Sequence, residues 1–203
     1  MKKKLDMKQM TTYATDFCNL EPSVLFLLRR LRSFDVHLYI QAVRSAYFSL
    51  ELAKGLNMTE QEQKIIYRSA LLQDVGKMQQ NNSNFLDHPI LSVNLLELMI
   101  DDGLIDRDAI MEHHENLDGT GYPKGIDWEK ISLTGRILRV ADSFASMIKF
   151  TRSNGEVNDV GLAMDELYRW GDMMYDIDLV DLLAFYYNPI AVQSIKKGAI
   201  SYL

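Results

Sequence analysis

Apolar residues recur along this chain at intervals of three and four positions, the spacing that places side chains on one face of an α-helix. A long pattern of this kind runs over residues 36–53 and stops near Gly55, a residue typical of helix ends. Thr59 is predicted to cap the next helix, because two glutamates follow it within three positions. The same spacing near the N-terminus is formed by Val24, Leu27, Leu28 and Leu31. No alternating run longer than about five residues favours a β-strand.

The four prolines stand where one helical pattern ends and another begins. Asp87 and Pro89 mark one such start, because aspartate caps helices and proline suits the first turn. The helix that they open is expected to continue to Ile100. Later helices are expected over residues 106–115, 132–150, 157–169, 179–187 and 189–197. The pattern therefore predicts an all-α fold, a single-domain bundle of roughly seven to nine helices.

Composition narrows the class of protein. A length of 203 residues suits one ample core, and a net charge of −6 gives no basic field that would attract a nucleic acid polymer. Cys18 is the only cysteine, so no intramolecular disulfide forms and a reducing, cytoplasmic location is expected. No stretch approaches the ~20 apolar residues of a membrane span.

The most informative run is residues 113–123, His-His-Glu-Asn-Leu-Asp-Gly-Thr-Gly-Tyr-Pro. Adjacent histidines at a helix end can each offer an imidazole to a metal ion. Two isolated histidines would more simply be solvated or capping side chains, but Glu115 and the glycine-rich loop favour a metal site. Carboxylates and a third histidine lie on other predicted helices or at their ends. The candidate ligands are Asp74, His88, His113, His114 and Asp142.

This set of imidazoles and carboxylates, without a thiolate, suits Fe²⁺, Mn²⁺ or Zn²⁺ better than Mg²⁺. Lys77 lies three residues after Asp74, where its ammonium can neutralise a phosphate oxygen. Asp74 and Lys77 are therefore the candidate catalytic residues. Two metals ~3.5–4 Å apart could share a hydroxide that attacks phosphorus in line.

The loop after the histidines is a candidate ligand-binding segment, since glycines let the backbone approach a ligand closely. Tyr122 has two interpretations, stacking on a ligand base or anchoring the loop. The residues assigned to this loop are Asp118, Gly119, Gly121, Tyr122 and Pro123.

Four segments resemble the HD-GYP proteins, a branch of the HD-domain metal-dependent phosphohydrolases, in order and spacing. They are residues 73–77, 87–89, 113–123 and 136–142, and the resemblance extends over about residues 35 to 190. It implies an all-helical domain over residues 35–203, preceded by a helical extension over residues 1–34. It also implies hydrolysis of a cyclic dinucleotide, especially cyclic di-GMP, at a centre of two or three metals.

The chain departs from the family pattern at positions that supply ligands to one of the metals. Gln73 stands where the family has the histidine of its His-Asp pair, and Gln41 matches an earlier histidine if Arg44 matches the family arginine. His37 lies one turn before Gln41 and is an alternative ligand. The family aspartate that follows Asp142 is an alanine here, and the family's Arg-Pro-Tyr run is missing from residues 150–155.

One metal position, with Asp74 and three histidines as its ligands, is therefore expected to be well formed. The second metal position is expected to be weakened or lost. Three functions follow from the resemblance. The first is a phosphodiesterase with reduced activity. The second is a catalytically silent relative that binds a ligand or a signalling protein, the latter through the Gly-Tyr-Pro loop. The third is a structural interaction domain with a relic metal site.

Overall fold

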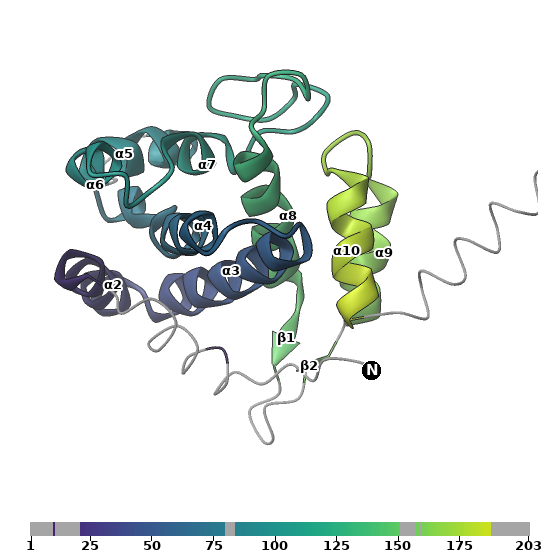
Figure 1. Cartoon of the computed structure of the whole chain (residues 1–203), viewed down its shortest axis with the longest axis horizontal. Coiled ribbons are helices and arrows are strands. Elements are labelled where there is room, and N and C mark those ends of the chain that lie inside the picture. The colour runs from purple at the N-terminus through teal and green to yellow at the C-terminus, as the bar shows by residue number, and fades with distance from the viewer. Residues whose placement is uncertain (1–9, 11–20, 80–83, 151–156, 159, 188–203) are drawn as a thin grey trace, which may run out of the picture.

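The computed structural model describes residue 10 and residues 21–79, 84–150, 157–158 and 160–187 (Figure 1). Nine α-helices lie within these residues, which confirms the predicted all-α fold. Two short 3-10 helices, η1 (Val75–Gln79) and η2 (Phe85–Asp87), separate α4 from α5. The α-helices are α2 (Pro22–Phe34), α3 (Val36–Gly55), α4 (Glu60–Leu72), α5 (His88–Leu95), α6 (Glu97–Asp101), α7 (Arg107–Glu112), α8 (Leu133–Met147), α9 (Val160–Arg169) and α10 (Ile177–Tyr187).

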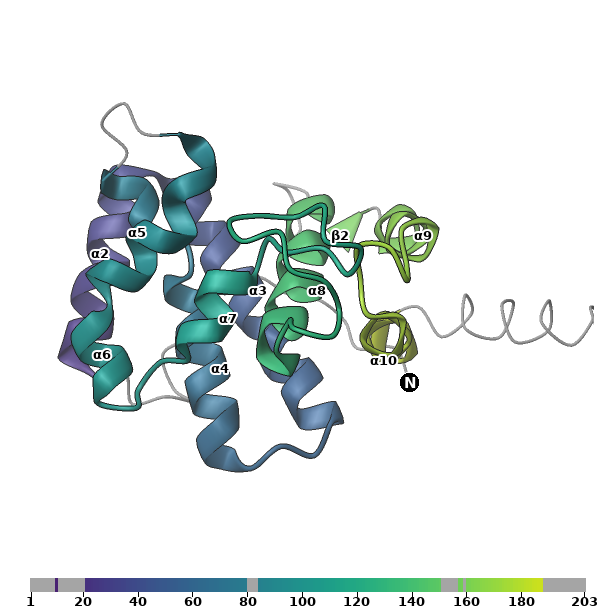
Figure 2. The same cartoon turned by 90° about the horizontal axis from the view of Figure 1, so that it is seen from above.

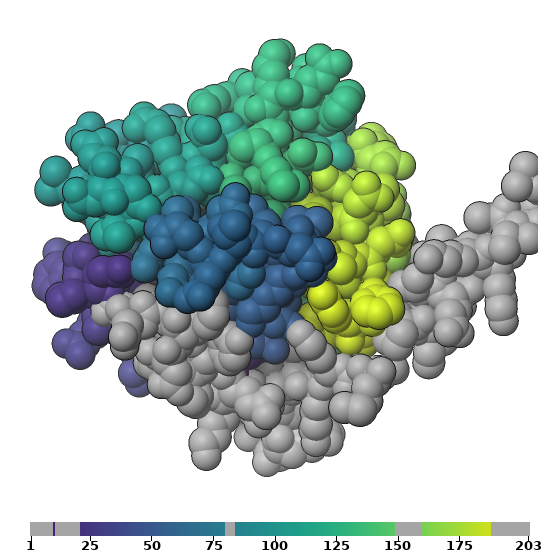
Figure 3. Space-filling view, viewed as in Figure 1, coloured from purple at the N-terminus to yellow at the C-terminus, as the bar shows by residue number. Residues whose placement is uncertain are grey.

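The long helix α3 packs against both α4 and α8 and forms the middle of the bundle. Helix α5 packs on η1 and α7, and α7 in turn packs on α8, so the turns that end α4 and α7 lie on the same side as the start of α5. Figure 2 shows α5, α7 and α8 following one another across this side of the molecule, with α9 and α10 beyond α8. In the space-filling view, the segment between α7 and α8 rises above the helices (Figure 3).

Aromatic rings fasten α3, α8 and α10 together in the core. The Phe48 ring meets Phe144 edge-on with centroids 4.7 Å apart and meets Tyr187 with centroids 5.5 Å apart. Phe48 and Phe144 are fully buried. Since α8 carries Asp142 and borders the histidine pair, this cluster also fixes the helix that forms one wall of the candidate site.

Local signals set several helix starts. Thr59 is the predicted N-cap of α4, and it forms a capping box with Glu62 in which each side chain bonds the backbone of the other. Asp106 and Ser132 cap α7 and α8 with their side-chain oxygens. Asp87, however, makes no side-chain cap bond at the start of α5.

Helix lengths depart from the predicted ones where distant parts of the chain meet. The helix expected over residues 132–150 ends at Met147, and β1 (Lys149–Phe150) pairs antiparallel with β2 (Val157–Asn158). The helix expected from residue 157 therefore begins at Val160. The single helix expected from Pro89 to Ile100 is divided into α5 and α6 at Leu96, and the one expected over residues 106–115 ends at Glu112. The helix predicted over residues 189–197 lies outside the described residues.

Helix α2 packs on α3, α4 and η1, and its Val24 and Leu28 belong to the same core as the other helices. The predicted boundary at residue 34, between an extension and the main domain, stays a prediction. No helix of the described residues is both long enough and apolar enough to span a membrane.

We expect Phe48→Ala to lower the free energy of unfolding by about 3–5 kcal/mol, because it removes a fully buried ring that joins three helices. Leu98, which is 79% exposed, supplies the control, and Leu98→Ala should change the unfolding free energy by no more than about 0.5 kcal/mol. Urea unfolding followed by circular dichroism measures both. Equal losses in the two variants would contradict this description of the core.

Candidate metal centre

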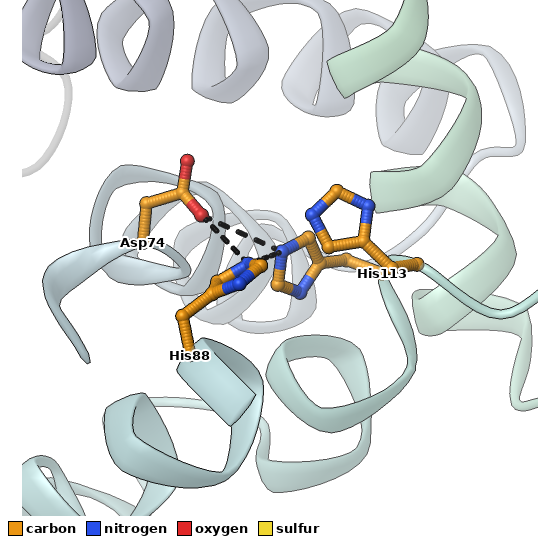
Figure 4. A group of neighbouring side chains, drawn as sticks. Asp74, His88 and His113 are labelled. Carbon is orange, nitrogen blue, oxygen red and sulfur yellow. Dashed lines mark hydrogen bonds and ion pairs between the residues drawn. The ribbon is translucent and has the colours of Figure 1, made fainter. Parts of the chain in front are cut away.

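Three separate turns of the chain bring four potential ligands together. Asp74 lies in the turn between α4 and η1, His88 is the first residue of α5, and His113 and His114 directly follow α7 (Figure 4). One ligand atom from each residue lies within 4.8 Å of the others. These are four of the five ligands proposed from the sequence.

The closest atoms of this cluster are one carboxylate oxygen of Asp74 and the Nε2 atoms of two histidines. Asp74 Oδ1 lies 3.2 Å from His88 Nε2 and 3.6 Å from His113 Nε2, and the two Nε2 atoms are 3.2 Å apart. His88 Nδ1 lies 3.0 Å from the Phe85 carbonyl and His113 Nδ1 lies 2.6 Å from the Ile110 carbonyl. A carbonyl only accepts, so each Nδ1 carries a proton, and in the neutral form of each ring the Nε2 lone pair faces Asp74.

The ionisation states strengthen this convergence. Burial raises the pKa of Asp74, but His113, His88 and the Lys77 ammonium outweigh it and hold the pKa well below its ordinary value, so the carboxyl is ionised. Burial, and then the neighbouring His113, lowers the pKa of His114 well below its ordinary value, so its imidazole is neutral. Asp74 Oδ1 is buried and makes no hydrogen bond of regular geometry. These residues fit a divalent cation, because an ionised carboxylate and imidazole nitrogens within 4.8 Å of one another are the ligands that such cations take.

Lys77 contributes a fixed positive charge beside the cluster. Its Nζ lies 2.8 Å from Asp74 Oδ1, and the ammonium also faces the Phe85 ring at 5.5 Å from the centroid. The predicted proximity of Lys77 to Asp74 is therefore present. The ion pair places one ammonium beside the cluster.

Ser92, which sequence reasoning missed, holds the Asp74 turn against α5. Its hydroxyl donates to the Gln73 carbonyl at 2.6 Å and accepts from the Gly76 backbone N–H at 2.9 Å. A Cβ at Gly76 would come within 2.4 Å of the His88 carbonyl oxygen. Only glycine therefore allows the chain to pass so close to the start of α5.

The loop after the histidines is held by buried carboxylates beneath it. Glu115 accepts from the backbone N–H groups of Lys124 at 2.7 Å and Ile126 at 3.2 Å. Glu112 accepts from the Ser132 N–H at 2.8 Å and so ties the end of α7 to the start of α8. Glu115 was noted in the sequence as part of the metal motif, and the structure gives it the role of clamping the loop.

The predicted loop residues all lie in this clamped segment. The Tyr122 ring stacks on His114 with centroids 4.7 Å apart, which places it beside the cluster. The Tyr122–Pro123 peptide bond is cis. A Cβ at Gly121 would lie 2.4 Å from the Asn116 nitrogen, and Gly119 has a positive φ of 78°. Asp118 is not directed at the cluster in this arrangement, since its carboxylate accepts from the Thr120 N–H and hydroxyl. Base stacking by Tyr122 stays a prediction.

Asp142 is not part of the cluster of four. Its Oδ1 accepts a hydrogen bond from Gln73 Nε2 at 2.8 Å and another from Gln41 Nε2 at 3.0 Å, and Gln41 also reaches its backbone carbonyl. An ionised carboxylate only accepts, so both amides must turn their NH₂ groups toward it. Gln41 and Gln73, the positions predicted from the sequence to match family histidines, therefore both donate to Asp142. A metal-ligand role for Asp142 stays a prediction.

His37, the alternative ligand, is exposed at the start of α3 and does not belong to the cluster. Arg139, which sequence reasoning also missed, lies on α8 three residues before Asp142 and donates to Asn116 Oδ1 at 2.8 Å. Its position inside the segment 136–142 was the only available signal.

Comparison with known proteins supports one family. The model of the HD domain matches residues 29–179. A cyclic di-GMP phosphodiesterase of Thermotoga maritima is 29% identical over 73% of this chain and 45% of its own length. The cyclic di-GMP phosphodiesterase response regulator RpfG of Xanthomonas campestris pv. campestris is 31% identical over 65% of this chain and 39% of its own length. The 3'3'-cGAMP-specific phosphodiesterase 1 of Vibrio cholerae is 30% identical over 53% of this chain and 28% of its own length. The chain thus spans less than half the length of these relatives.

We expect the purified protein to bind about one Mn²⁺ or Fe²⁺ per chain, and Asp74→Asn or His88→Ala to lower this to near zero, because each removes a donor from the cluster. Metal analysis after desalting measures the stoichiometry. His37→Ala is the matched control, since it removes the one histidine outside the cluster. Equal metal content in His37→Ala and His88→Ala would contradict the assignment.

Proposed function

We propose that this chain, which belongs to the HD-domain family and to its HD-GYP branch, is a metal-dependent phosphodiesterase of cyclic dinucleotides, with cyclic di-GMP as the first candidate substrate. The observation that carries the proposal is the convergence of Asp74 Oδ1 with two imidazole lone pairs beside Lys77. The activities of the named relatives support the choice of substrate class.

In this proposal Asp74, His88, His113 and His114 hold the cation, which is Fe²⁺, Mn²⁺ or Zn²⁺ by its ligand set. When bound, such a cation supplies Lewis-acid polarisation of a phosphoryl oxygen and lowers the pKa of water. Lys77 offsets the negative charge that develops on the phosphate. The clamped loop and the Tyr122 ring, which stacks on His114, form one wall of the site.

The proposed activity is reduced relative to a centre with two metals. Around Asp142, the amides of Gln41 and Gln73 provide the positive ends of two dipoles where a second cation would otherwise neutralise the carboxylate. Amide donors satisfy the carboxylate but supply no Lewis acid. The second metal position is therefore weak in this proposal.

The same hydrogen bonds favour a second candidate function. If one metal does not suffice for hydrolysis, the chain is a silent relative that binds a cyclic dinucleotide, or a signalling protein through the Gly-Tyr-Pro loop. No role for a nucleic acid polymer is proposed, given the net charge of −6. A cytoplasmic location is proposed from the single cysteine, Cys18, which lies outside the described residues.

We expect slow hydrolysis of cyclic di-GMP with Mn²⁺, or with Fe²⁺ in the absence of oxygen, and a loss of more than roughly a hundredfold in Asp74→Ala, because a lost metal removes several kcal/mol of transition-state stabilisation. Chromatography of the nucleotide products measures the rate. Asp102→Ala, which removes an exposed carboxylate, should leave the rate unchanged. No hydrolysis by the folded wild-type protein would favour the silent alternative.

Restoring both imidazoles in the double variant Gln41→His/Gln73→His should raise the metal content from about one to about two per chain, since Asp142 would then lie between metal ligands rather than amide donors. The hydrolysis rate should rise with the second metal. Gln61→His adds a histidine at an exposed glutamine and controls for adventitious binding. An unchanged metal stoichiometry in the double variant would mean that α3, the helix that carries Gln41, is wrongly matched to the family.

A further inference from the structure

Arg139 carries a positive charge without a carboxylate partner. It projects from α8, and its guanidinium donates to two neutral acceptors, Asn116 Oδ1 at 2.8 Å and Ser143 Oγ at 3.1 Å. The guanidinium also lies over the Tyr175 ring, 5.0 Å from its centroid. Within the described part of the chain, no aspartate or glutamate forms an ion pair with Arg139.

Most of the hydrogen-bonding capacity of this guanidinium is unused. Arginine has five N–H donors, of which Asn116 and Ser143 take two. The Nε atom of Arg139 is buried, so the N–H groups left for a ligand are one on each Nη atom. An anion that met these two groups would satisfy a positive charge that has only neutral partners in the described residues.

The position of Arg139 relates this charge to the metal centre. Asn116, which holds one end of the guanidinium, lies two residues after His114, and Ser143 is adjacent to Asp142. After burial and the neighbouring histidine, the Arg139 charge is among the influences that lower the pKa of His114. Lys77 lies beside Asp74. The candidate metal centre therefore has one cation from η1 and a second from α8 near it.

We propose that Arg139 binds a phosphate group of the nucleotide and is a substrate-binding residue of this chain. A guanidinium held by one face on an aromatic ring offers its remaining N–H groups in a plane, which matches two oxygens of one phosphate. The inference rests on the proposed function, because a cyclic dinucleotide carries two phosphodiester groups. Lys77 meets the phosphate at the metal, and Arg139 meets phosphate oxygens on the α8 side.

A purely structural role predicts a different pattern of substitutions. Arg139→Gln keeps an amide that can donate to Asn116 or Ser143 but removes the charge. Arg139→Lys keeps the charge but loses the planar fork. If Arg139 serves only to join α8 to the loop, glutamine is the milder change; if it binds phosphate, lysine is.

The test is equilibrium binding of cyclic di-GMP to the Mn²⁺-loaded full chain at two salt concentrations, with nucleotide integrity and thermal unfolding checked for each variant. We expect Arg139→Gln to weaken binding about tenfold to a hundredfold, and Arg139→Lys to weaken it less. The wild-type affinity should also fall more steeply with salt than that of Arg139→Gln.

Wild-type affinity in Arg139→Gln, or a larger loss in Arg139→Lys than in Arg139→Gln, would overturn the inference while leaving the proposed function intact. Absence of binding by the wild-type chain to both cyclic di-GMP and 3'3'-cGAMP is a separate outcome. It would overturn the proposed function and this inference with it.

Discussion

The structure depends on a place where a buried carboxylate and two imidazoles meet beside one ammonium. Asp74 Oδ1 and the Nε2 atoms of His88 and His113 lie 3.2–3.6 Å apart, and both Nδ1 protons are committed to backbone carbonyls. Burying an ionised carboxylate is costly, and the Lys77 ammonium, 2.8 Å from the same oxygen, offsets part of this cost; a cation bound by Asp74 and the imidazoles would offset more of it. The packing of α5 on η1 and α7 brings the three turns together, so the bundle is arranged around this electrostatic requirement.

The carboxylate of Asp142 also needs partners for its charge, and amide groups supply them. Asp142 is also a partly buried carboxylate, but two amide N–H groups from α3 and from the end of α4 satisfy its Oδ1. Two amides thus satisfy this carboxylate within an HD-type fold. A chain of this kind can keep the shape of a two-metal enzyme, retain one cation, and still offer charge to a phosphate through Lys77 and Arg139.

Sequence alone predicted the parts of this account that depend on local pattern or on residue type. The periodicity of residues 36–53 predicted α3, and the capping residues predicted the start of α4 at Thr59. The end of α8 could not be predicted, because its apolar pattern continues into a strand that pairs with residues 157–158. Histidines and Asp74 were recognisable as candidate ligands by their type. The bond between Gln41 and Asp142 joins residues 101 positions apart, and no local signal reveals it.

The most direct test of the account is a crystal structure of the chain grown with Mn²⁺, with anomalous diffraction used to locate the metal. The account predicts one strong anomalous peak between Asp74, His88, His113 and His114, with Gln41 and Gln73 still bonded to Asp142. Two peaks of equal strength, with Asp142 coordinating the second, would contradict the central claim that amide donors replace a metal on that side.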